Sequence, residues 1–529
     1  MLVYVVALIG AGVWAGRLSR RKGNAESTKG YFLAGRHMPV WAVTISTLAT
    51  AQSAATFVAV PQDAYDGSLV YLSASIGSVL AGFILAVVFI PAYYRLGVST
   101  PYQVLEKRFG NRARVATSVA YLFGRVFASG ARLYIGAIPL TIALFGERTP
   151  SSLAVVLLAF TIFAILFTLR GGLESVIWTD VLQVCVYLGA GVAVLVFLWY
   201  SIPGSAGDVF KALSTGRSDG GSKLAIIDPG IDTSQSPWIN LAAPFTLLTA
   251  VTGWTLLNLA ALGTDQDLAQ RLLTCKDAKS GARSAIASTL VGLPAVALFA
   301  CIGLLLWVFC TQSQLMGRPT PEYVQGNTAD MFMRVVLNEM PAWLVGLVLA
   351  GVLAAGPAGH NATLNSMAST LIADVYRPLR AGRSEAHYLF VGRWMVVGCG
   401  VILCVFAVLC AIWQAKSGEN LISFVLGVMG FAYAGLLGVF LTALLTNRGT
   451  ATSAIAAMIT GFVVVLLLQP LVIKPVMGAV FGVVRGAELA QTFTLASPWR
   501  LCIGVACACA VCMLPRGKAK DSLMKSTRG

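Results

Sequence analysis

Apolar runs of about 20 residues recur along this chain, and they decide what it can fold into. Each run is long enough to cross a bilayer core of about 30 Å as a helix. Helices are expected because a backbone in lipid must satisfy its own hydrogen bonds. We therefore predict an all-α polytopic membrane protein of about 13 transmembrane helices. The approximate spans are 1–18, 38–60, 68–95, 115–145, 151–169, 174–202, 241–263, 284–312, 341–372, 388–413, 419–446, 451–470 and 499–515.

The charge distribution agrees with this reading. Only 11% of the residues are charged and 57% are hydrophobic, whereas a soluble domain carries about 25% charged residues. The net charge of +16 does not indicate a nucleic-acid partner, because the basic residues gather in alternate short loops, which favours the positive-inside rule. We predict a multi-pass protein of the plasma or inner membrane, with the lipid bilayer as a partner, the N-terminus outside and the C-terminus cytoplasmic.

Two of the spans carry signs of a broken helix. The second span reads "TISTLATAQSAATFVAVPQDAY" and places hydroxyl and amide groups before Pro61. The seventh reads "GWTLLNLAALGTDQDLAQR" and includes Asn258 between two glycines. Close helix packing explains such residues in part. A discontinuous helix whose freed carbonyls face a cavity explains the density of polar groups in the second span better.

Of the ionisable residues within predicted spans, four are candidates for function, because each needs a partner at membrane depth. Arg125 lies nearer the inner end and can extend toward that surface. Arg132 lies near mid-depth, either as a structural ion pair or as a clamp for a carboxylate. Asp180 meets a cation, a proton or an arginine such as Arg125. His360 sits in "LAAGPAGHNATLNS" (353–366), either packed through a hydrogen bond or responding to protons.

Several segments, in matching order and spacing, resemble the sodium/solute symporter family of sodium–glucose, proline, pantothenate, iodide and sialic acid carriers. They are "STPYQVLEKRFG" (99–110), "GGLESVIWTDVLQ" (171–183), "GTDQDLAQR" (263–271) and "LNSMASTLIADVY" (364–376). The resemblance covers about residues 1–470. It implies a leucine-transporter-like core of five plus five helices in inverted repeat, with one extra helix before it and two after it. The expected division of this single transporter domain is 1–37, 38–202, 241–446 and 451–529.

The resemblance also implies a sodium site between the first and eighth core helices. Backbone carbonyls are expected at Ala49, Gln52 and Ala355, and the family usually has two hydroxyls at positions 358 and 359. This chain has Ala358 and Gly359 there. A second sodium is implied near Asp180, where Asn361 can supply an oxygen. The missing hydroxyls predict weakened sodium binding, and His360 beside them is a candidate for proton coupling.

The resemblance bears on the solute as well. In sugar carriers of the family an acidic residue and an amide contact hydroxyls, but the matching positions here are Ser75 and Leu426. Thr56, Ser78 and Asn258 still match substrate positions, while the aromatic inner gate is replaced by Ala261. Together with Arg132, these residues favour a small carboxylate or zwitterion over a sugar.

The predicted function is secondary active import of a small organic solute by alternating access, with a monovalent cation, sodium or a proton, as partner. The alternatives are a facilitator, a proton-coupled carrier and a sensor that does not transport. No catalytic set predicts an enzyme, and no cofactor is expected apart from Na⁺ as a coupling ion.

Overall fold

The computed structural model describes residues 4, 6–8, 10–11, 36–52, 54–98, 100–168, 173–217, 220–231, 240–324, 328–417, 421–481 and 495–514. Most of the first predicted span, 1–18, and the basic tail after residue 514 lie outside these described residues. The remaining predicted spans can all be compared with the structure.

Helices of membrane-crossing length and hydropathy account for the predicted spans. Within the described residues, six helices are long and apolar enough to cross a bilayer singly, and up to nine if each of three bent pairs is one span. Three shorter apolar helices, Pro150–Leu166, Ala451–Leu467 and Ser497–Met513, complete the set. These segments coincide one for one with the predicted spans from the second to the thirteenth, which confirms the all-α polytopic fold.

The chain order of the elements is as follows. The first half contains α3 (Val40–Ala51), α4 (Ala54–Asp66), η2 (Leu69–Ser73), α5 (Ala74–Ile84), η3 (Leu85–Phe89), α6 (Ile90–Leu96), α7 (Tyr102–Phe109), α8 (Asn111–Phe145), α9 (Pro150–Thr168), α10 (Leu173–Ser201) and α11 (Ala206–Ser214). The second half contains α12 (Leu247–Thr249), η4 (Ala250–Trp254), α13 (Thr255–Gly263), α14 (Gln266–Leu272), α15 (Ala278–Thr311), α16 (Ser313–Met316), η5 (Glu322–Val324), α17 (Thr328–Glu339), α18 (Ala342–Thr370), η6 (Leu371–Tyr376), α19 (Arg377–Leu379), α20 (Glu385–Ser417) and α21 (Leu421–Leu445). After these come α22 (Ala451–Leu467), α23 (Pro470–Phe481) and α25 (Ser497–Met513).

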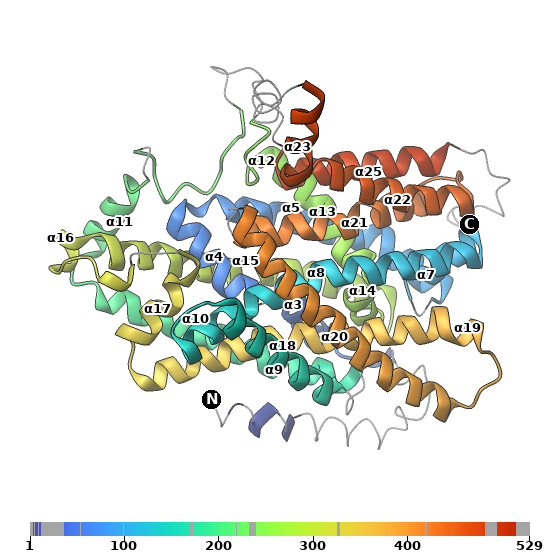
Figure 1. Ribbon diagram of the computed structural model, residues 1–529, viewed down its shortest axis with the longest axis horizontal. Helices are drawn as coiled ribbons and strands as arrows, with labels where there is room; N and C mark the ends of the chain where they lie inside the picture. Colours follow the sequence, from blue (N-terminus) through green and yellow to red (C-terminus); the bar gives the residue numbers. More distant parts are fainter. Residues whose placement is uncertain are drawn as a thin grey trace.

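The long helices run side by side along the long axis of the molecule (Figure 1). The short helices α11, α16 and α17 gather at one end of this bundle, and α7 and α19 lie toward the other end (Figure 1). Helix α17 lies in the loop between the eighth and ninth predicted spans. The division into repeats at 38–202 and 241–446 remains a prediction, as do the boundaries of the flanking segments.

The two predicted helix breaks are present. The axes of Val40–Ala51 and Thr56–Asp66 differ by 60°, and those of Leu247–Gly263 and Gln266–Leu272 differ by 69°. A third bend of 49° separates Phe424–Phe431 from Tyr433–Leu445 and was not predicted. Helix α18, in contrast, continues through Gly356, Pro357 and Gly359 without a break, because the helix remains the way to satisfy backbone groups in lipid.

An aromatic cluster fixes the position of α4 after the first break. The ring of Phe57 lies with its centroid 5.6 Å from that of Tyr187, 4.9 Å from Phe299 and 5.5 Å from Phe332. These partners come from α10, α15 and α17, so the second half of the broken helix packs against three elements at once. Aromatic pairs at such separations add stabilisation beyond the area that they bury.

The helices that follow the core pack through small residues. A Cβ atom added to Gly461 of α22 would lie 2.4 Å from the backbone nitrogen of Gly435 in α21. No side chain fits at that crossing, so both glycines are required for the close approach. Small residues at helix crossings are the usual means of association in a bilayer, where apolar surface alone gives little drive.

Candidate functional site

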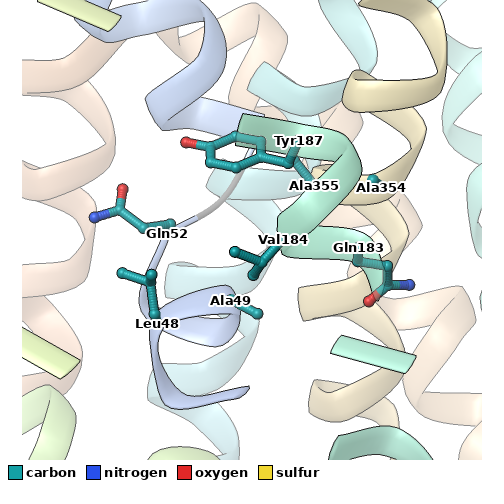
Figure 2. A pocket seen from close by; sticks show the side chains of 8 residues that line it. All are labelled: Leu48, Ala49, Gln52, Gln183, Val184, Tyr187, Ala354 and Ala355. Carbon is teal, nitrogen blue, oxygen red and sulfur yellow. The ribbon is translucent and has the colours of Figure 1, made fainter. Parts of the chain in front are cut away.

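The first cavity lies where the broken helix meets two others. About 300 Å³ of empty space, part of it open to solvent, lies at the end of α3 between residues of α3, α10 and α18. The lining residues are Leu48, Ala49, Gln52, Gln183, Val184, Tyr187, Ala354 and Ala355. Figure 2 shows Val184 of α10 pointing toward the end of α3 at Leu48 and Ala49. The three residues expected to offer carbonyls to sodium, Ala49, Gln52 and Ala355, therefore line one cavity.

The helix break frees backbone carbonyls at the end of α3. Gln52 has an extended backbone, with ψ at 150°. The backbone N–H of Gln52 donates to the carbonyl of Leu48 at 2.8 Å. Helix α4 begins only at Ala54, so the carbonyls at the end of α3 are not continued into a regular ladder. Backbone oxygens at a helix break suit a hard cation such as sodium.

The second cavity lies on another side of α18 and is lined by two arginines. About 370 Å³ of empty space, part of it open to solvent, lies between α3, α8 and α18. The lining residues are Thr50, Arg125, Ser129, Arg132, Leu133, Gly356, Gly359, His360 and Thr363. Gly359 thus lines this cavity with His360, and Gly359 is absent from the lining of the first.

Arg132 is the arginine of this cavity that lacks a strong partner. The Nη1 atom of Arg132 lies 3.5 Å from the carbonyl oxygen of Thr50, and Nη2 lies 3.5 Å from the sulfur of Met429. The contact to the carbonyl of Thr50 is long for a hydrogen bond, and the thioether sulfur of Met429 is a weak acceptor. No carboxylate of the described residues forms an ion pair with Arg132, so the structural ion pair considered for it is not seen within the described part of the chain.

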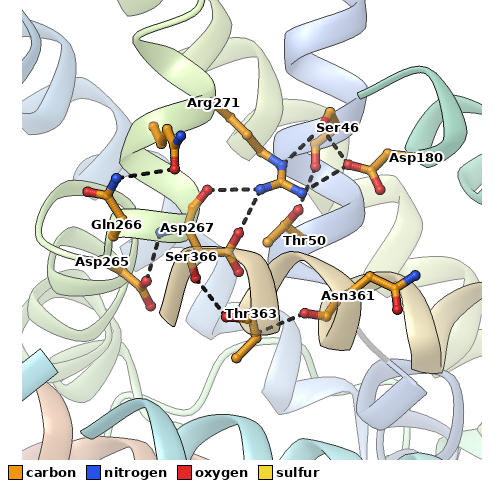
Figure 3. Close-up of polar contacts among 12 residues, drawn as sticks. Ser46, Thr50, Asp180, Asp265, Gln266, Asp267, Arg271, Asn361, Thr363 and Ser366 are labelled. Carbon is orange, nitrogen blue, oxygen red and sulfur yellow. Dashed lines mark hydrogen bonds and ion pairs between the residues drawn. The ribbon is translucent and has the colours of Figure 1, made fainter. Parts of the chain in front are cut away.

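A buried charge network lies beside the cavities, and Figure 3 shows the part of it around Arg271. Arg125 of α8 forms ion pairs with Asp265 and Asp267 at the second helix break. Arg271 lies 2.7 Å from Oδ1 of Asp267 and 3.1 Å from Oδ2 of Asp180 on α10. The side chains of all four ion pairs are at most 3% exposed. Three carboxylates therefore share two guanidinium groups, which leaves one negative charge in excess.

Neutral groups complete the network. Ser46 of α3 donates to Oδ2 of Asp180 at 2.6 Å and accepts from Nε of Arg271 at 3.0 Å. Tyr433 of α21 donates to Asp265 at 2.9 Å. Arg125 also donates to the hydroxyl of Thr363 on α18 at 2.8 Å. The network thus ties the broken helices to α8, α10, α18 and α21.

The network corrects one expectation and refines another. Arg125 does not extend to the surface, because Arg125 is 4% exposed and held by two aspartates. The arginine that pairs with Asp180 is Arg271, not Arg125. Asp265, Asp267 and Arg271 were not among the site residues predicted from the sequence. Three charged residues within "DQDLAQR", next to a broken helix, were the available signal.

The other expected site residues are spread over several elements. Thr56 lies on α4, and Ser75 and Ser78 lie on α5, all three partly buried. The amide of Asn258 donates to the carbonyl of Trp254 in its own helix at 2.8 Å. Asn361 is buried, and its backbone carbonyl accepts from Thr168 at 3.3 Å. The side chain of Ala358 lies outside the described residues. The assignment of these residues to solute or sodium stays a prediction.

A buried lysine contacts the far end of the first broken helix, where α4 ends. Lys223, in the loop after α11, donates to the carbonyls of Tyr65 and Gly67 at 2.7 and 3.0 Å, just at and beyond the end of α4. The ammonium also lies 4.9 Å from the centroid of the Trp307 ring. Burial lowers the pKa of Lys223 from 10.5 to about 8, and Asp66 opposes this effect only in part.

A bundle of membrane helices with two broken spans around buried cavities is the architecture of a secondary transporter. Comparison with known proteins agrees and is more specific. The model of the sodium:solute symporter family matches residues 31–461. The chain belongs to the sodium:solute symporter family.

Individual relatives match along most of this chain. The sodium/sialic acid symporter SiaT of Proteus mirabilis (strain HI4320) is 27% identical over 472 residues, which covers 88% of this chain and 87% of SiaT. The sodium/glucose cotransporter of Vibrio parahaemolyticus is also 27% identical, with 88% of this chain and 84% of that protein covered. The human sodium/iodide cotransporter is 26% identical, with 82% and 63% covered.

A solved structure supports the same fold. The structure of a Na⁺-coupled sialic acid symporter, in a substrate-bound outward-open state with a novel Na⁺ site, matches with a TM-score of 0.74 at 22% identity. The match covers 97% of this chain and 95% of that one. The leucine-transporter-like fold inferred from the sequence is thereby confirmed. The chain is a multi-pass membrane protein of a family of sodium-coupled transporters.

Proposed function

We propose that this protein imports a small organic carboxylate or zwitterion together with sodium, by alternating access. The observation that carries the proposal is the second cavity, where the guanidinium of Arg132 lies between α3, α8 and α18 with only two contacts of 3.5 Å. Arg132 is partly buried, and a guanidinium withdrawn from water gains from a carboxylate partner. A solute carboxylate supplies the missing partner and forms two parallel hydrogen bonds to the planar fork.

The choice of a carboxylate agrees with part of the relatives. Sialic acid, named for SiaT and for the solved symporter, is itself a carboxylic acid. Glucose and iodide, named for other relatives, show that the family alone does not fix the solute. Arg132 and the lack of an acidic residue at Ser75 favour an acid over a sugar.

We assign the coupling sodium to the first cavity. Ala49, Gln52 and Ala355 line that cavity together, and the end of α3 supplies backbone oxygens. Ala358 and Gly359 supply no side-chain oxygen. The assignment therefore predicts a sodium site of low affinity, because each lost ligand to a desolvated cation costs free energy.

We assign Asp180 to the path of the coupling cation. The network around Asp180 has one carboxylate more than guanidinium groups, and an excess buried negative charge attracts a cation. Asn361 and His360 remain candidates for a second sodium and for proton coupling. A proton-coupled carrier or a facilitator is favoured over a sodium symporter only by the two missing hydroxyls.

We also propose an orientation for the protein in the membrane. The basic loops place the N-terminus outside and the C-terminus in the cytoplasm, in the plasma or inner membrane. The end of the bundle that carries α7 and α19 is then the cytoplasmic end, and α11, α16 and α17 face outward.

The experiment is an uptake screen in proteoliposomes, with acids, amino acids and sugars, repeated in sodium-free buffer. The proposal expects saturable uptake of an acid or zwitterion that depends on an inward sodium gradient. Uptake of a neutral sugar in preference to every acid would overturn the solute class. Uptake that needs neither gradient would indicate a facilitator.

A further inference from the structure

His360 presents a second unsatisfied group to the cavity that contains Arg132. The side chain is 4% exposed, and neither Nδ1 nor Nε2 has a hydrogen-bond partner. Buried polar atoms are nearly always paired in folded proteins, so each exception needs an explanation. His360 lines the same cavity as Arg132 and reaches it from a different helix.

The other polar side chains of this cavity are already engaged. Thr50 donates to the carbonyl of Ser46 at 2.9 Å, and the hydroxyls of Ser129 and Thr363 lie 3.2 Å apart. Arg125 is held by two aspartates. Nε of Arg125 has no partner within the described residues, but Arg132 and His360 are the two polar side chains of the described cavity lining that lack any strong partner.

We propose that His360 is a second recognition residue for the solute's anionic group. The proposal rests on the proposed function, since it assumes that Arg132 binds a solute carboxylate. An imidazole N–H then donates to an oxygen of the same carboxylate that the guanidinium fork holds. The anion bridges α8 and α18 and selects for a compact carboxylate that fits between the two side chains.

The position of His360 also connects the solute to the ion. Ala355, which lines the first cavity, precedes His360 by five residues on the continuous helix α18, or about 7.5 Å along its axis. A solute held by His360 and a cation held near Ala355 then contact one rigid element from two sides. A closed state of α18 that contacts both ligands is favoured only when both are bound, and this dependence couples solute movement to cation movement.

The test uses the small number of histidines. The chain contains three, His37, His360 and His387, so the full-length protein labelled with ¹⁵N-histidine gives few imidazole signals. Substitutions His37→Gln and His387→Gln assign them. The probes are sialic acid, lactate, pyruvate and proline, each compared with its uncharged amide or ester. The acid that most raises the Tm of the wild type is used for titration.

We expect that acid to shift the imidazole signals of His360 and to leave those of His387 unchanged. His360→Leu should weaken binding of the acid by about 10- to 100-fold, the loss expected for a hydrogen bond to a charged group. His360→Gln keeps an N–H donor and should retain part of the affinity. A purely structural histidine would not respond to the acid in the wild type.

The outcomes separate this inference from the proposed function. If Arg132→Ala abolishes binding while the His360 signals do not move and His360→Leu binds normally, the inference is overturned and the carboxylate site stands. If no acid binds more tightly than its uncharged derivative, the carboxylate site fails and the inference fails with it.

Discussion

The Nη2 atom of Arg271 lies 3.1 Å from Oδ2 of Asp180, and the two residues are 91 positions apart in the chain. Arg271 follows the second helix break, and Asp180 lies on α10, which lines the first cavity through Val184 and Tyr187. Ser46 contacts both side chains from α3. Movement of α14 must therefore disturb the ion pair between Arg271 and Asp180, and movement of α3 must disturb the hydrogen bonds that Ser46 makes to it.

Arg132 should determine the affinity for the solute. Arg132→Ala removes the fork, so saturable binding of the preferred acid should fall at least 100-fold, while the protein still inserts and purifies as a folded monodisperse species. Arg132→Lys should recover only part of the affinity, because an ammonium cannot make the bidentate contact. Isothermal titration measures this. An unchanged dissociation constant in Arg132→Ala would refute the role.

Asp180 should matter more for accumulation than for solute binding. Asp180→Asn removes the excess negative charge of the network and weakens the attraction for the cation. We expect sodium-driven accumulation in proteoliposomes to fall at least tenfold, while equilibrium binding of the acid at saturating sodium changes less than threefold. Proportional losses in binding and accumulation would show that Asp180 does not act on the ion path.

Arg125 should be required for the fold. Arg125→Gln leaves three buried aspartates with one guanidinium, and breaking a buried pair in this way costs about 3–5 kcal/mol. A matched control is Arg377→Gln, which removes an ion pair to Glu385 whose side chains are 40% and 66% exposed and should cost less than about 1 kcal/mol. Thermal melts of the purified proteins compare the two. Equal Tm losses would contradict the structural role of the network.

Lys223 should make the stability of the loop after α11 depend on pH. An unfolded lysine keeps its proton to about pH 10.5, whereas Lys223 in the folded protein releases its proton near pH 8. Between these values the unfolded chain binds more protons, so the folded state gains stability as the pH rises.

The control for this prediction is Lys223→Met, which keeps the stem and removes the titration. The Tm of the wild type should rise relative to that of Lys223→Met by about 1–2 °C between pH 7.5 and pH 10. A relative fall over the same range would contradict the lowered pKa of Lys223.

The sequence alone predicted the spans and the first two helix breaks, because long apolar runs and clustered polar residues act locally. The continuity of α18 through Gly356 and Pro357 could not be predicted, since local propensity opposes it and the bilayer overrides that preference. The partner of Asp180 was also undetermined. Both Arg125 and Arg271 are near the same end of the bundle, and only tertiary packing decides between them.

The residues that line the cavities could also be predicted only in part from the sequence. The residues assigned to sodium by family resemblance, Ala49, Gln52 and Ala355, do line one cavity, but Gly359 lines the other. That separation arises from the rotation of successive residues around a helix by about 100°, together with packing against α8 that the sequence does not encode locally. The bend near Phe431 follows Gly427 and Gly430, but glycines in a span indicate close helix packing as readily as a bend.

Solute uptake across a sodium series at fixed pH tests the central claim, sodium-coupled transport through a weakened site, most directly. The account predicts that sodium activates uptake of the preferred acid and that saturation requires on the order of 100 mM sodium, because two hydroxyl ligands are missing. The double substitution Ala358→Ser with Gly359→Ser should lower that concentration, and a Cβ at Gly359 meets no atom within 4 Å. Uptake indifferent to sodium, driven instead by an inward proton gradient and lost in His360→Ala, would contradict the account.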